Sequence, residues 1–148
     1  MIDEKQIDAE EMARIFGLSE GHFFDLKRSA VSPSKLSESV SAFANTAGGE
    51  LFIGIGEDSN RSVRFWDGFK SMEDANGLFA LLRDIVPMGM RYHGTWLSSD
   101  VHPGFVLHLV IPKTKDIVKA SNNHPYWTIF PTLLLPQPRI VGSDAEGG

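Results

Sequence analysis

A helical pattern that ends at a double glycine and leads directly into an apolar strand is the feature that most constrains this chain. Ser32-Pro33 begins the pattern, since serine can cap a helix and proline is tolerated in its first turn. Four apolar residues fall on one face of the expected helix: Leu36, Val40, Phe43 and Ala44. Gly48-Gly49 ends the helix, Asn45 is expected in its C-cap, and an apolar strand follows over residues 51–56.

A strand over residues 20–28 is expected before this helix, and it carries charged residues. A period of two puts Asp25 and Lys27 on the same face of the strand. If the helix is a crossover between neighbouring strands, the strand ends approach each other and carboxylates cluster at one edge of the sheet. The acids concerned are Glu20, Asp25, Glu57 and Asp58, of which the last two begin a polar turn expected after residue 56.

The rest of the chain supplies further helices and strands. Residues 4–16 predict one amphipathic helix that ends at Gly17. Residues 71–74 resemble a capping box, and the helix after them should end at Pro87. Residues 90–97 and 105–111 alternate like paired strands, and residues 126–130 predict a last short strand. The predicted fold class is α/β (α+β), with a mixed, mostly antiparallel sheet and helices packed on it.

The totals fit one globular domain. With 148 residues, 42% hydrophobic and 22% charged, we expect a single domain over residues 1–141 and a disordered tail over residues 142–148. No apolar run is long enough to span a bilayer, and the acidic N-terminus does not resemble a secretory signal, so a cytoplasmic location is expected. The absence of cysteine excludes disulfides and thiolate metal sites.

The clustered acids suggest a metal site. Carboxylates that lie together repel and need a counter-charge, and Mg²⁺ or Mn²⁺ prefers oxygen ligands. Lys27 could then orient a water or stabilise charge on a phosphoryl group. An Asp-x-Lys pair on a strand is also the arrangement that restriction-type nucleases use. The alternative is that these residues are solvated charges, with Asp25 and Lys27 paired on an exposed face.

Three segments resemble the Schlafen AlbA-like domain. They are Phe24-Asp25-Leu26-Lys27, then Ser41-Ala42-Phe43-Ala44-Asn45-Thr46-Ala47-Gly48-Gly49, and then Leu51-Phe52-Ile53-Gly54-Ile55-Gly56-Glu57-Asp58. The resemblance implies an α/β domain related to nucleic-acid-binding folds. Some members are metal-dependent endoribonucleases that act on tRNA and rRNA, whereas many bacterial members have no shown activity and are named as candidate transcriptional regulators.

The resemblance also implies site residues. The three acids of the active members fall on Glu20, Asp25 and Glu57, which would be both catalytic residues and metal ligands for Mg or Mn, and the family lysine falls on Lys27. Asp25 stands where glutamate is usual and Glu57 where aspartate is usual. The last aromatic strand also lacks the arginines that usually follow it. The residues expected to contact nucleic acid are Lys27, Arg28, Lys113 and Lys115.

Three functions remain open at this point. The first is a metal-dependent endoribonuclease that cleaves structured RNA such as tRNA. The second is a non-catalytic nucleic-acid-binding or transcription-regulatory module, with RNA or DNA as the partner, acting within a homo-oligomer or a larger assembly. The third is a protein-interaction domain, which the net charge of −5 favours because nucleic-acid binders are more often basic.

Overall fold

A computed structural model describes residues 2–18, 23–58, 60–61, 63–85, 91–129 and 133–136. The elements in chain order are β1 (Ile2–Ile7), α1 (Ala9–Phe16), β2 (Phe24–Lys27), α2 (Pro33–Asn45), β3 (Gly49–Ile53), β4 (Ile55–Asp58), β5 (Val63–Trp66), the 3₁₀ turn η1 (Met72–Ala75), α3 (Asn76–Ile85), β6 (His93–Ser99), β7 (Phe105–Ile111), β8 (Tyr126–Ile129) and β9 (Leu133–Pro136). Within these residues, no helix has the length and apolar character needed to cross a membrane.

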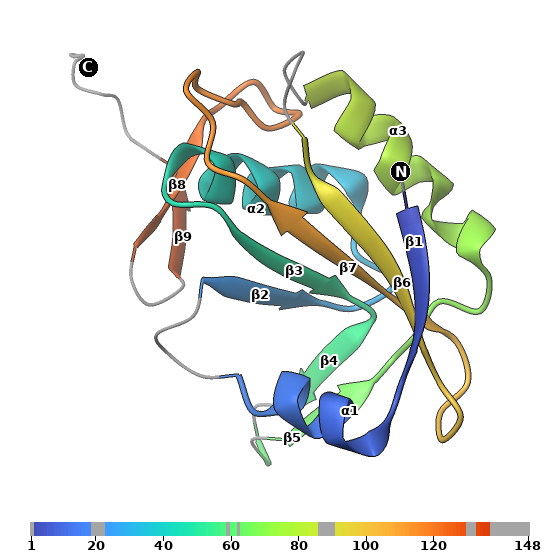
Figure 1. The fold of residues 1–148 in the computed structure, drawn as a ribbon. Coiled ribbons are helices and arrows are strands. Elements are labelled where there is room, and N and C mark those ends of the chain that lie inside the picture. Colours follow the sequence, from blue (N-terminus) through green and yellow to red (C-terminus); the bar gives the residue numbers. More distant parts are fainter. Residues whose placement is uncertain are drawn as a thin grey trace.

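The main sheet has five strands in the order β1-β6-β7-β3-β2. The pairs β1–β6 and β2–β3 are parallel, and the pairs β6–β7 and β3–β7 are antiparallel. Helices α2 and α3 pack on one face of the sheet, and α1 covers part of the other face (Figure 1). The hairpins β4–β5 and β8–β9 lie outside the sheet. A mixed sheet with helices packed on it confirms the predicted fold class.

The unit β2–α2–β3 forms as its sequence predicts. Ser32 caps α2 by accepting a hydrogen bond from the Lys35 backbone N–H at 3.2 Å, and the two flanking strands are parallel neighbours. Gly48 turns the chain with a φ of +79°, which a residue with a side chain rarely adopts. Leu51, Phe52 and Ile53 are all fully buried because β3 is covered on both faces, which explains its unbroken apolar run.

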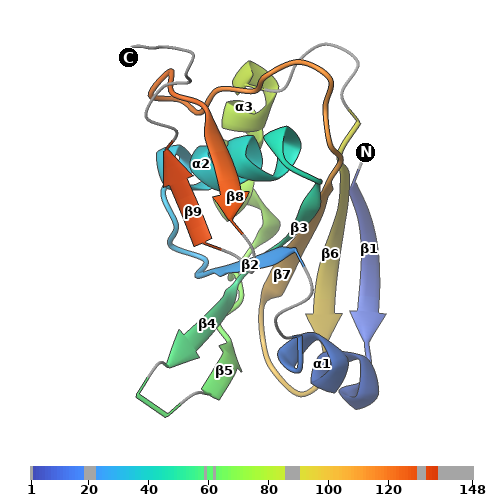
Figure 2. The same cartoon turned by 90° about the vertical axis from the view of Figure 1, so that its left-hand side faces the viewer.

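The apolar run after the double glycine is two strands rather than one. β3 ends at Ile53, and Gly54, with a φ of +116°, redirects the chain into β4. The polar turn predicted from Glu57 begins later, since Glu57 and Asp58 lie in β4 and pair with β5, and the Arg61 N–H donates to the Asp58 carbonyl at 3.2 Å. Figure 2 shows the β4–β5 hairpin projecting away from the main sheet.

The single helix predicted over residues 4–16 is also wrong. Residues 2–7 form β1, the edge strand beside β6, and α1 begins only at Ala9. Asp8 caps α1 by accepting a hydrogen bond from the Glu11 backbone N–H at 2.8 Å. Pairing with a strand nearly a hundred residues away in sequence overrides the local helical pattern.

Several other predicted boundaries can be compared with the structure. The capping box at Ser71 and Asp74 is present, and the strands β6 and β7 are antiparallel. β8 matches the strand predicted over residues 126–130, but it is not the last one, because β9 follows it. The strand predicted over residues 20–28 is shorter, because β2 covers only Phe24–Lys27. Residues 19–22, Pro87, Phe130 and the expected tail at 142–148 lie outside the described residues.

A polar stripe on α2 holds the 118–126 segment. Asn45 donates hydrogen bonds to the backbone carbonyls of Val118 and Tyr126, both at 2.9 Å, and accepts one from the Val118 N–H at 2.8 Å. Ser41 donates to the Val118 carbonyl and accepts from the Tyr126 N–H. One helical turn earlier, Ser37 accepts a hydrogen bond from the Ser121 N–H. Asn45 was predicted in the C-cap of α2, but it is the last residue of the helix and the C-cap residue is Thr46.

Candidate functional site

Asp25 and Lys27 form an ion pair on the edge strand β2. The Lys27 Nζ lies 3.0 Å from the Asp25 Oδ2, as their shared face of the strand predicted. The Ser39 hydroxyl, on α2, donates a hydrogen bond to the same Oδ2 at 3.0 Å. The pairing that the alternative predicted is therefore present, but the Asp25 and Lys27 side chains are only 23% and 17% exposed, so their face is not the open, solvated one that it assumed.

One oxygen of Asp25 has no hydrogen-bond donor among the described residues. Oδ2 accepts from both Lys27 and Ser39, whereas no described residue donates to Oδ1. Lys27 and Ser39 fix the orientation of the carboxylate, and Oδ1 keeps the free lone pairs that a hard divalent cation requires. Ser39 had no role in the sequence prediction. Its spacing does not distinguish it from the other serines of α2.

Glu57 lies on β4, a strand that contacts β2 but does not belong to the main sheet. It is opposite Arg64 of β5, and its Oε2 lies 3.4 Å from the Arg64 Nε. The Glu57 side chain is 53% exposed, so it also has oxygen available for a ligand. Arg64 is held by further contacts, because it donates to the backbone carbonyls of Phe16 and Leu18 at 3.0 and 2.7 Å.

The structure describes two of the three predicted acids, Asp25 and Glu57. Glu20 and His22 lie outside the described residues. Over the ranges that the structure does describe, no three His, Cys, Asp or Glu side chains are grouped so that they could hold a metal ion. The fit to a divalent cation therefore rests on the open oxygens of Asp25 and Glu57, and the role of Glu20 stays a prediction.

The residues predicted to contact nucleic acid differ in their partners. Arg28 follows β2, is 62% exposed, and pairs with Asp67 at 3.0 Å. Partial burial opposes ionisation of Asp67, but hydrogen bonds from Arg28 and Ser29 outweigh it and lower the Asp67 pKa. Lys113 and Lys115 follow β7, are exposed, and form no ion pair with any described acid. These two lysines are free to contact phosphate.

A second partly buried polar pair, between His108 and Glu50, was not anticipated from the sequence. On the sheet face that α1 partly covers, His108 of β7 and Glu50 of β3 approach to 2.8 Å between Nε2 and Oε1. The His108 ring stacks on Phe52 with ring centroids 4.3 Å apart. Burial lowers the pKa of His108, and the neighbouring Glu50 only partly opposes this. The ring is therefore kept neutral and donates to the carboxylate.

The free energy of unfolding should fall as the pH is lowered from about 7.5 to about 5.5, with His108 as one cause. The pKa of His108 is lowered in the folded chain, so the unfolded chain binds more protons once the pH passes below its ordinary value of about 6.5. His108→Gln keeps a donor for Glu50 and should flatten this dependence in urea denaturation. His124→Gln, at an exposed position, is the control, and an unchanged slope in His108→Gln would contradict the assignment.

Comparison with known proteins identifies a family and two similar folds. A family described as "Schlafen, AlbA_2" matches residues 20–129. The chain belongs to this Schlafen AlbA_2 family. The match covers the β2–α2–β3 unit, the β4–β5 hairpin and the 118–126 segment that α2 holds. A comparison with curated proteins gave no match.

Two solved structures resemble the fold of this Schlafen AlbA_2 domain. One is the N-terminal domain of a Nitrosomonas europaea protein described as related to the ATP-dependent DNA helicase RecG, at 19% identity and a TM-score of 0.58, covering 93% of this chain and 88% of that one. The other is the DIP2311 protein from Corynebacterium diphtheriae, at 18% identity and a TM-score of 0.53. That match covers 78% of this chain and 22% of the Corynebacterium chain.

Proposed function

We propose that this domain binds RNA and cleaves it as a metal-dependent endoribonuclease, with Asp25 and Lys27 at the centre of the site. The observation that carries the proposal is the Asp25–Lys27 pair at 3.0 Å, in which one carboxylate oxygen has no described partner. An acid and an ammonium group held together at a sheet edge are suited to phosphodiester hydrolysis, because charge develops on the phosphoryl oxygens.

Each residue of the site has a distinct part. Asp25, Glu57 and Glu20 would hold Mg²⁺ or Mn²⁺, which when bound supplies a Lewis acid and an acidified water. Lys27 places positive charge beside the carboxylate and would stabilise the developing charge on the phosphate. Ser39 positions Asp25 through its hydrogen bond. Arg28, Lys113 and Lys115 would contact the phosphate backbone of the RNA.

Cleavage of tRNA by the purified chain with Mn²⁺ should fall by roughly a hundredfold or more in Asp25→Asn. The substitution keeps the size of the side chain but removes its charge. Asp100→Asn, at an exposed turn, is the matched control and should cleave like the original chain. The assay follows tRNA fragments on a denaturing gel, with and without EDTA, and circular dichroism confirms that each variant is folded.

A non-catalytic nucleic-acid-binding or regulatory module is the second candidate. It is favoured by Glu57, because the Glu57 carboxylate is paired with Arg64 of the projecting hairpin and is not grouped with Asp25 and a third described acid. This candidate gives a salt-sensitive electrophoretic shift of RNA or DNA, weakened in the double variant of Lys113→Gln and Lys115→Gln, with intact RNA at high protein and Mn²⁺. That result would overturn the nuclease. No shift at low salt, with a stable oligomer by light scattering, would favour a protein-interaction domain over both.

A further inference from the structure

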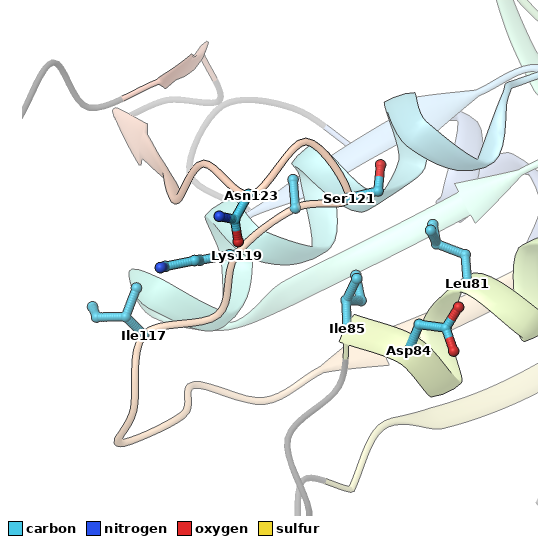
Figure 3. A pocket seen from close by; sticks show the side chains of 8 residues that line it. Leu81, Asp84, Ile85, Ile117, Lys119, Ser121 and Asn123 are labelled. Atoms are coloured by element: carbon cyan, nitrogen blue, oxygen red, sulfur yellow. The ribbon is translucent and has the colours of Figure 1, made fainter.

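A pocket of about 460 Å³ lies between α3 and residues 117–123, away from the Asp25–Lys27 site. Its volume falls within the range that is usual for small-molecule ligands. In Figure 3, Leu81 and Ile85 lie on the α3 side, one turn apart, whereas Lys119 and Asn123 come from the facing segment, and the Lys119 side chain extends away from α3. Both sides of the pocket thus combine apolar and polar residues, because Asp84 lies on the α3 side and Ile117 on the facing segment.

Of the polar side chains at this pocket, Ser121 is bonded to Ser37, and the other three are available for a ligand. Among the described residues, the side chains of Asp84, Lys119 and Asn123 have no hydrogen-bond or ion-pair partner. The pocket also has an exposed apolar group, because Ile117 is 55% exposed at its rim. A carboxylate, an ammonium and an amide beside apolar side chains can together recognise a ligand that has a flat ring, hydrogen-bond donors and an anionic group.

The charges beside the pocket decide which ligand fits. Lys119 lines the pocket, and Lys113 and Lys115 precede it on the same exposed stretch, without ion pairs to described acids. Such a row of ammonium groups suits a chain of phosphates. On the α3 side, the Asp84 carboxylate can only accept hydrogen bonds, so it suits a ligand that carries a donor such as an exocyclic amino group. The two walls therefore match the two ends of a nucleotide.

We propose that this pocket receives one unstacked nucleotide of single-stranded RNA, with a preference for a base that carries an exocyclic amino group. The base would lie against Leu81, Ile85 and Ile117, with its amino group toward Asp84 and its phosphates toward Lys119. Unpaired bases in loops and ends of RNA are the parts that proteins read in this way. The inference rests on the proposed RNA binding and adds a base preference at a second site.

The test compares oligocytidine with oligouridine of equal length, since the two bases differ by an amino group against a carbonyl oxygen at the same position. Fluorescence anisotropy at low salt should show the full chain binding oligocytidine roughly tenfold more tightly, about the worth of one hydrogen bond to a charged group. In Asp84→Ala the ratio should fall to about one. In Ile117→Ala both affinities should fall, and the preference should remain.

A matched control removes the general effect of charge. Asp116→Ala deletes an exposed acid among the same lysines but outside the pocket lining, so it should strengthen both complexes and keep the ratio. The pocket assignment would be overturned if the unaltered chain bound oligocytidine and oligouridine equally well, or if the Asp84→Ala variant kept the preference for oligocytidine. If tRNA is bound but neither oligonucleotide is, the pocket assignment fails and the proposed function stands. If no RNA is bound at all, both fail.

Discussion

Replacing Asn45 by alanine should lower the free energy of unfolding by about 3 kcal/mol. Asn45 lies buried at the end of α2 and bonds three backbone groups, of which the Val118 N–H and the Tyr126 carbonyl have no second side-chain partner among the described residues. Both would be left without a hydrogen bond, at a cost of about 1–3 kcal/mol each. The Val118 carbonyl would be less affected, because Ser41 also donates to it at 2.6 Å.

Urea denaturation followed by tryptophan fluorescence measures this loss. Asn60→Ala is the control, because Asn60 lies exposed beyond β4 and uses only its backbone N–H, which donates to Asp58. It should change the free energy of unfolding by less than about 0.5 kcal/mol. If Asn45→Ala cost no more than this control, the hydrogen bonds of Asn45 would not be what fixes the 118–126 segment.

Gly49→Ala should cost up to about 3 kcal/mol of folding free energy. A Cβ atom at this position would lie 2.2 Å from the Cδ1 of Phe43, well inside van der Waals contact. Phe43 is 1% exposed and is packed in the core between α2 and the sheet, so its ring has no room to move aside. The glycine is thus required by the close approach of helix and strand.

Two comparisons isolate this clash. In Gly56→Ala the new Cβ would also lie 2.2 Å from an aromatic carbon, the Cζ of Phe65, but that ring is partly exposed and can rotate away at lower cost. In a double-mutant cycle, Phe43→Leu should relieve part of the cost of Gly49→Ala. Strictly additive effects of the two substitutions would show that the ring is not the obstacle.

The parts of the fold that could be predicted from the sequence are those whose signals are local. The cap at Ser32, the double glycine and the period of two in β2 act over a few residues, so α2 and the Asp25–Lys27 pair were predicted correctly. The N-terminal strand could not be predicted in this way. Its residues also fit a helical pattern, and only pairing with β6 decides between the two.

The candidate site was predictable to a similar extent. Which acids carry the family pattern follows from the sequence, but the break at Gly54 that places Glu57 on a separate hairpin does not. The roles of Ser39 and Asn45 were missed because serine and asparagine in a helix are usually expected at its ends. The four-residue spacing of Ser37, Ser41 and Asn45 was a signal of a polar stripe, although not of the segment that it binds.

The polar stripe of α2 also has a consequence during synthesis on the ribosome. Asn45 finds its partners 73 and 81 residues later in the chain, so the β2–α2–β3 unit is complete well before the segment that covers its outer side has been made. Throughout that interval the stripe presents hydroxyl and amide groups, which water solvates. An apolar stripe in the same place would expose an aggregation-prone hydrophobic surface on the nascent chain. Because hydrogen bonds share this junction with the apolar contacts of Val118 and Tyr126, the helix face that waits for the late segment is less apolar than a purely hydrophobic junction would require.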